Sequence, residues 1–161
     1  MGKELGLLEK LEMIIPGFRG YKKKELIRED DILIRRYIYN EISKLKDRIR
    51  KLQLRALDGR YGGSLTLLDR IWKALDLAGS KIKNAPAGYA GLFDRVKVRE
   101  NELEMLKEVD SRIAARVLEL NELIGRVEQD PSLLEDFYFK VEDLVNAIED
   151  RNNLFKAEAP T

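Results

Sequence analysis

The chain has 161 residues, of which 44% are hydrophobic and 37% are charged, and its formal net charge is +1. This length fits one domain with a sizeable core. Because Cys and His are both absent, the composition excludes disulfides, thiol chemistry, an imidazole base and the common thiolate or imidazole metal sites.

The first predicted element is a short helix over residues 1–15, with an apolar stripe on one side. Pro16 and Gly17 end this helix, and Gly20 completes a corner. A long helix is predicted over residues 21–58, because its apolar residues recur at intervals of three and four, the rhythm of a coiled-coil seam. The two stripes comprise Leu7, Leu8, Leu11, Ile14 and Ile15, followed by Ile38, Ile42, Leu45, Ile49, Leu52 and Ala56.

The segment DGRYGGS interrupts the helical pattern, and its Ser64 is a good N-cap for the next helix. Asp130 and Pro131 are typical of the start of a last helix. Four main helices with short connections predict an all-α, antiparallel up-down four-helix bundle with a short extra N-terminal helix, in a single domain of residues 1–161. The three helices predicted after the long one cover residues 64–83, 92–128 and 131–156.

Targeting signals are not apparent in the sequence. No apolar run is long enough to cross a bilayer. The first residues, MGKELGLLEKLEMII, mix acidic with apolar side chains, which argues against a signal peptide. Gly6 stands where the myristoylation pattern needs Ser or Thr. We therefore expect a cytoplasmic protein that does not bind membranes.

Charge is divided unevenly along the chain. Residues 1–99 contain 23 Lys and Arg against 13 Asp and Glu, a balance of +10. Residues 100–161 contain 7 against 16, a balance of −9. Two interpretations remain open: basic and acidic helices lie side by side and neutralise each other, or the basic half faces an acidic partner.

Known catalytic motifs are missing from the sequence, which contains no P-loop and no Gly-x-Ser-x-Gly turn. Clustered carboxylates leave a Mg²⁺ or Mn²⁺ site open as an alternative, although a solvated acidic face is the simpler interpretation. These carboxylates are Glu100, Glu102, Glu104, Glu108, Glu142 and Asp143. We expect a protein that is not an enzyme and has no cofactor and no metal.

The stretch IPGFRGYKKKEL, residues 15–26, combines a Pro-Gly break, two aromatic residues and a run of lysines. Basic residues beside aromatic ones can bind phosphate backbones, and opposite charges such as Asp31 and Arg35 pair at helical spacing. The candidate partner-binding residues are Phe18, Arg19, Tyr21, Lys22, Lys23, Lys24, Arg28, Asp31 and Arg35.

The longer stretch IPGFRGYKKKELIREDDILIRR resembles the opening of a family of small, uncharacterised bacterial and archaeal helical proteins. These proteins begin with an Ile-Pro-Gly-aromatic-x-Gly-Tyr corner, followed by a charged stretch of Arg-Glu-x-Asp type and a hydrophobic-Arg pair. The resemblance covers about the first quarter of the chain; it implies no particular activity, but it implies that the corner is the functional region. The matching residues are Ile15, Pro16, Gly17, Phe18, Gly20, Tyr21, Glu25, Arg28, Glu29, Asp31 and Arg35.

The expected function is that of a non-catalytic protein-interaction or scaffold protein. Its partner is expected to be another protein or a second copy of the chain in a homodimer. Nucleic-acid binding by the basic N-terminal half is the first alternative, and a carboxylate-metal enzyme is the second. The short N-terminal helix is expected to pack on its own bundle or on that of a second copy.

Overall fold

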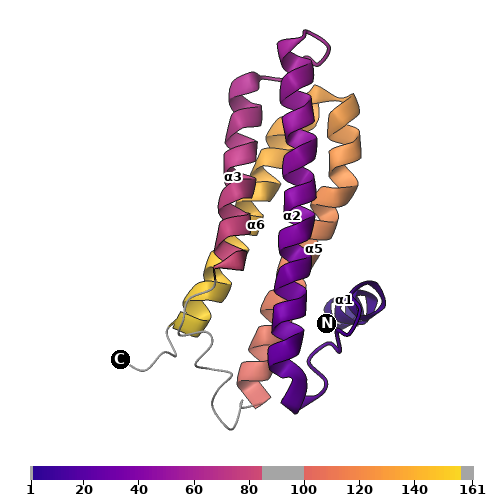
Figure 1. Ribbon diagram of the computed structural model, residues 1–161, viewed down its shortest axis with the longest axis vertical. Coiled ribbons are helices and arrows are strands. Elements are labelled where there is room, and N and C mark those ends of the chain that lie inside the picture. Colours follow the sequence, from indigo (N-terminus) through magenta and orange to yellow (C-terminus); the bar gives the residue numbers. More distant parts are fainter. Residues whose placement is uncertain (1, 85–99, 157–161) are drawn as a thin grey trace.

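The computed structural model describes residues 2–84 and 100–156, and no strand occurs among them. The chain is an all-α helical bundle, as its sequence predicts (Figure 1). The helices are α1 (Gly2–Ile14), α2 (Ile27–Leu57), α3 (Leu65–Lys83), α5 (Glu100–Gln129) and α6 (Leu134–Lys156), with two 3₁₀ turns, η1 (Lys24–Leu26) and η2 (Pro131–Leu133).

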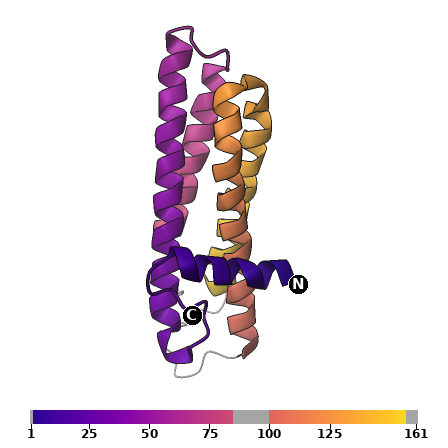
Figure 2. The same cartoon turned by 90° about the vertical axis from the view of Figure 1, so that its right-hand side faces the viewer.

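The long helices α2, α3, α5 and α6 run alternately up and down around one core (Figure 1). α2 packs beside α3 and α5, and α6 packs beside the same two helices. The short helix α1 lies crosswise over α2 and α5 (Figure 2). The predicted antiparallel four-helix bundle is therefore confirmed, and its extra helix docks on the chain's own bundle.

The core is built from the apolar stripes that the sequence indicates. Side chains such as Ile38 and Ile42 on α2, Leu75 on α3 and Val117 on α5 are completely buried. Burial of each Leu or Ile side chain stabilises the fold by about 1.5–3 kcal/mol relative to exposure. Within the described residues, none of the helices combines the length and the apolarity that a membrane span requires.

One predicted helix start is wrong, and another lies outside the described residues. The long helix was expected from residue 21, but α2 begins at Ile27, because Tyr21 has a φ of 63° and therefore cannot lie inside a right-handed helix. The start predicted at residue 92 lies outside the described residues, and α5 is described from Glu100 onward.

The two hairpin connections that the structure describes, between α2 and α3 and between α5 and α6, use the predicted caps. The Ser64 hydroxyl accepts a hydrogen bond from the Leu67 N–H at 3.2 Å and so caps α3. The Asp130 carboxylate accepts from the Ser132 N–H at 3.0 Å before α6 begins. Between the two hairpins, the buried Tyr61 hydroxyl donates to the Val127 carbonyl at 2.7 Å, and burial raises its pKa to about 12.

Candidate functional site

The corner, defined here as residues 15–26, joins α1 to α2 through an unusual backbone path. Gly17 and Gly20 have φ angles of 85° and 64°, which glycine adopts without steric cost. Tyr21 has a φ of 63°, a left-handed conformation that costs a residue with a side chain about 1–2 kcal/mol. Such strain persists only where the surrounding contacts hold the backbone in place.

Aromatic packing holds the corner from the inside. Phe18 and Tyr21 are both buried, and their rings meet edge to face with centroids 5.7 Å apart. The backbone N–H of Phe18 donates to the Ile15 carbonyl at 3.1 Å, which closes the turn behind Pro16. These two rings therefore belong to the core of the chain and form the base of the corner.

A single carboxylate, that of Asp30 in the first turn of α2, fixes the corner backbone. Its Oδ1 accepts from the Arg19 N–H at 2.8 Å and its Oδ2 accepts from the Tyr21 N–H at 2.9 Å. Asp30 is buried, and this burial raises the pKa of its carboxyl above the ordinary value of 3.8, although both backbone donors and the Arg19 charge act in the opposite direction.

Asp30→Asn is expected to destabilise the protein at neutral pH, by about 1–2 kcal/mol, because the amide NH₂ would face one of the two buried backbone donors. The difference from the wild type should widen as the pH falls from 7 to 4. The folded pKa of Asp30 lies above the unfolded one, so the wild type takes up a proton on folding and gains stability through that window, whereas Asn cannot. Urea unfolding of both proteins across this pH range measures the difference. A gap that narrows in acid would mean that the backbone donors outweigh burial.

A buried charge network lies directly behind the corner. Arg151 of α6 is completely buried, and its Nε donates to Oδ1 of Asp110 at 2.5 Å while its Nη2 donates to Oδ2 at 3.2 Å. The same Nη2 donates to Oδ1 of Asp31 at 2.6 Å. The Tyr21 hydroxyl donates to Oδ2 of Asp110. One guanidinium thus connects α2, α5 and α6, and the tyrosine adds the corner to them.

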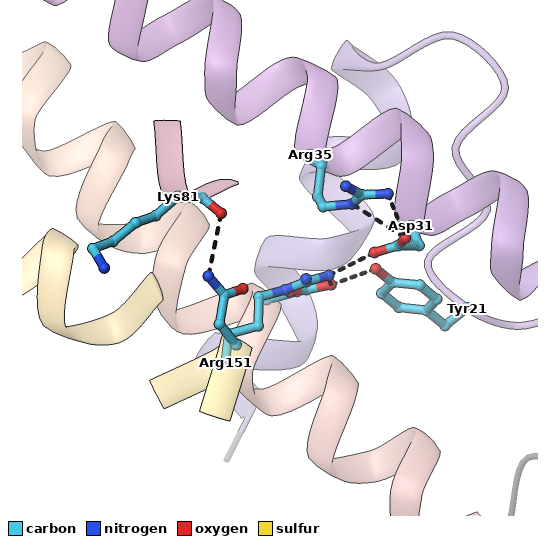
Figure 3. A network of polar contacts seen from close by, with 7 residues as sticks. Tyr21, Asp31, Arg35, Lys81 and Arg151 are labelled. Carbon is cyan, nitrogen blue, oxygen red and sulfur yellow. Dashed lines mark hydrogen bonds and ion pairs between the residues drawn. The ribbon is translucent and has the colours of Figure 1, made fainter. Parts of the chain in front are cut away.

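Arg35 extends this network toward the surface. Its Nη2 lies 3.0 Å from Oδ2 of Asp31, whereas Nη2 of Arg151 donates to Oδ1 of the same carboxylate (Figure 3). This confirms the predicted pairing of Asp31 with Arg35, one helical turn apart. Because Arg151 binds two carboxylates through a planar fork of donors, the network fixes the geometry of the corner more strictly than apolar packing alone would.

The predicted partner-binding residues divide into two groups. Phe18, Tyr21 and Asp31 are buried, and Arg35 is half-buried, so these four side chains support the corner from within. The others are exposed, namely Arg19, Lys22, Lys23, Lys24 and Arg28.

Among the exposed residues, Lys22 pairs with Glu12 of α1 at 3.0 Å. Within the part of the chain that the structure describes, no ion pair joins Arg19, Lys23 or Lys24 to a carboxylate. The corner therefore presents three cations, those of Arg19, Lys23 and Lys24, that no ion pair within the described residues neutralises. They are available to a partner.

Basic residues on the long helix are neutralised to a larger extent. Lys46 lies 2.7 Å from Asp76 of α3, and Nε of Arg48 donates to Glu128 of α5 at 3.0 Å. Lys44 pairs with Glu41 on the same helix. The Arg48–Glu128 contact joins the basic half of the chain to the acidic half, and so does Lys81 of α3, which lies 2.9 Å from Glu149 of α6. These two contacts favour the interpretation in which oppositely charged helices lie side by side.

Among the carboxylates whose side chains the structure describes, no three lie close enough together to hold a metal ion. The side chain of Glu100, a member of the predicted cluster, lies outside the described residues. Glu104 instead pairs with Lys107 at 3.3 Å, and Glu108 lies 3.8 Å from Arg112.

Comparison of the chain with protein-family models, with curated proteins and with solved structures finds no match. The resemblance of the first quarter of the chain to a prokaryotic helical family therefore stays a prediction.

Proposed function

We propose that the protein is a non-catalytic interaction protein whose corner docks on an acidic surface of a protein partner. The observation that supports this proposal is the contrast between the two sides of the corner. Its inner side is fixed by Asp30 and by the Arg151 network, whereas its outer side carries Arg19, Lys23 and Lys24 without an ion pair among the described residues.

A rigid display of charge favours binding. Exposed lysines on a flexible loop lose side-chain and backbone entropy when they dock. A backbone that is already fixed loses less, so the same cations bind more tightly and more selectively. Cations near an acidic surface also accelerate association and make it sensitive to salt.

Two charge variants with equal net charge test the proposal. The corner variant combines Arg19→Gln, Lys23→Gln and Lys24→Gln. The control variant combines Lys44→Gln, Lys51→Gln and Arg60→Gln, which are exposed positions away from the corner. Each variant changes the net charge from +1 to −2. All three proteins are crosslinked in nuclease-treated lysate of the source cells, and the partner recovered with the wild type is then purified and titrated.

The corner variant is expected to bind the purified partner about tenfold or more weakly, and the control variant to bind like the wild type. Equal weakening by both variants would show that net charge alone governs binding and would contradict the proposal. In a parallel lysate left without nuclease, recovery of nucleic acid and of no protein would transfer the function to the alternative of nucleic-acid binding. Sedimentation of the purified chain alone, at low and at high salt, shows whether it forms a homodimer, and so distinguishes a second copy of the chain from a different protein.

A further inference from the structure

Two adjoining cavities of about 220 Å³ each lie between α2 and α3. Tyr39 and Lys83 line both of them, whereas Ile42 lines only the first and Ile82 only the second. Together the two cavities are called the α2–α3 groove here. One cavity is polar, with walls that include Ser43, Lys46, Asp76, Ser80 and Asn84. The other is mainly apolar, with Ile32 and Ile82 beside the stems of Arg35 and Arg36.

The groove is positively charged. Lys46, Lys83 and Arg36 contribute three cations, against the carboxylate of Asp76. Arg35 also lines the groove, but its guanidinium pairs with Asp31. Within the described residues, Lys83 has no carboxylate partner, and its Nζ lies 5.1 Å from the centroid of the Tyr39 ring.

Lys46 shows how an anion would enter. Its Nζ lies 2.7 Å from Oδ1 of Asp76 and 4.8 Å from the centroid of the Trp72 ring. Because the Asp76 side chain is 55% exposed, it can turn into solvent when an anion takes its place beside Lys46.

Gly79 leaves room in the wall of the polar cavity. It lies inside α3 without a positive φ, so the backbone does not require glycine. A Cβ there would lie 3.5 Å from Ile42 and 3.7 Å from Tyr39, which are ordinary contacts, so packing does not require glycine either. Glycine is also one of the least favourable residues inside a helix. What the missing side chain provides is space in the cavity.

We propose that the α2–α3 groove binds a small phosphate monoester. The phosphate lies in the polar cavity, where Lys46 and Lys83 supply charge from two helices and the hydroxyls of Ser43 and Ser80 donate hydrogen bonds. The apolar part of the ligand lies against Tyr39 and Ile82 in the second cavity. This binding site is separate from the cations of the corner and does not depend on the proposed protein partner.

Phenyl phosphate is the probe for this site, because it carries a phosphate and one flat apolar group. Trp72 is the single tryptophan of the chain and contacts Lys46, so its fluorescence reports an anion that displaces Lys46 from Asp76. A saturable change in emission is expected, and isothermal titration calorimetry gives the Kd. Phenyl phosphate should bind about tenfold more tightly than inorganic phosphate, because only the ester fills the apolar cavity.

Variants of the groove residues show whether phenyl phosphate binds in the α2–α3 groove. Lys46→Met and Lys83→Met should each weaken phenyl phosphate binding about tenfold by calorimetry, whereas Lys73→Met, an exposed lysine of α3 that pairs with Asp69, should not. Gly79→Ala adds a methyl group to the wall of the polar cavity and should also weaken binding. Its matched control is Gly125→Ala in α5, where a Cβ meets no atom within 4 Å. Both alanines should raise the melting temperature, so weaker binding by Gly79→Ala does not come from unfolding.

The proposal fails if phenyl phosphate gives no saturable signal at millimolar concentration. It fails equally if Lys46→Met or Gly79→Ala binds like the wild type, because the ligand then lies elsewhere. Equal affinity for inorganic phosphate and phenyl phosphate would remove the role of the apolar cavity and overturn the monoester assignment. Preferential binding of a single-stranded oligonucleotide over phenyl phosphate would replace the small ligand by nucleic acid.

Discussion

Arg151→Met is expected to lower the free energy of unfolding by about 3–5 kcal/mol, because it removes one partner of a buried ion network. Asp110 would lose the guanidinium that donates to both of its oxygens, and Asp31 would lose one of its cations. Both carboxylates are buried, so water does not replace the lost donors. Urea unfolding followed by circular dichroism at neutral pH measures the change.

Arg112→Met is the matched control on α5. Arg112 lies 3.8 Å from Glu108 at the surface, an exposed pair that contributes less than about 1 kcal/mol. The double variant Asp110→Asn with Arg151→Met should be no less stable than Arg151→Met alone. It removes the buried charge of Asp110, which has lost its Arg151 partner in the single variant. If Arg151→Met unfolds like the control, the network does not hold the bundle together.

The same variant should also loosen the corner. The Tyr21 hydroxyl donates to Asp110, and Asp110 is positioned by Arg151, so the left-handed turn at Tyr21 depends on both. Faster amide hydrogen exchange is expected at Tyr21, whose N–H is bonded to Asp30, at concentrations of denaturant that leave the bundle folded.

Much of the fold follows from periodicity alone. The stripes of Ile and Leu at intervals of three and four identify the helices, and the short connections make neighbouring helices antiparallel. The caps at Ser64 and Asp130 also follow from residue type and position. These features are local, so a single sequence contains them.

The buried pairing of Asp110 with Arg151 has a signal in the sequence. Asp110 follows Leu106 by four residues and precedes Ile113 by three, and Arg151 follows Ile148 by three. Each charged residue therefore occupies a core position of its stripe. In an up-down bundle, the start of one helix and the end of the next lie at the same end of the molecule, so opposite charges at these two positions predict a buried pair.

The corner was harder to predict. Its geometry depends on Asp30, which bonds backbone groups nine and eleven residues earlier, and on the left-handed φ of Tyr21. Neither feature has a periodic pattern. Apolar residues at helical spacing continue from α2 back toward the corner, so the sequence suggests a long helix that begins before Ile27. For the same reason the sequence offered Phe18 and Tyr21 as partner contacts, whereas the structure places both in the interior.

Leu11→Ala is expected to lower the free energy of unfolding by about 2–5 kcal/mol, although Leu11 lies in the short helix α1. Its side chain is completely buried where α1 lies across the bundle (Figure 2). The loss should appear in the main unfolding transition, because α1 contacts α5 and is joined to α2 by a corner that is itself packed into the core. Thermal and urea unfolding, each followed by circular dichroism and by Trp72 fluorescence, measure it.

Met13→Ala is the control, since Met13 is 88% exposed on the same helix and its removal should change stability by less than about 0.5 kcal/mol. If Leu11→Ala leaves the main transition unchanged and only frays α1, then α1 is an appendage that can leave the bundle. A detached α1 would no longer hold Glu12 beside Lys22. The corner would then present its cations on a less ordered backbone, and the advantage of a rigid docking surface would be lost. Coincident loss of stability by both probes instead makes α1 a structural part of the domain, and with it the fixed geometry on which the proposed interaction depends.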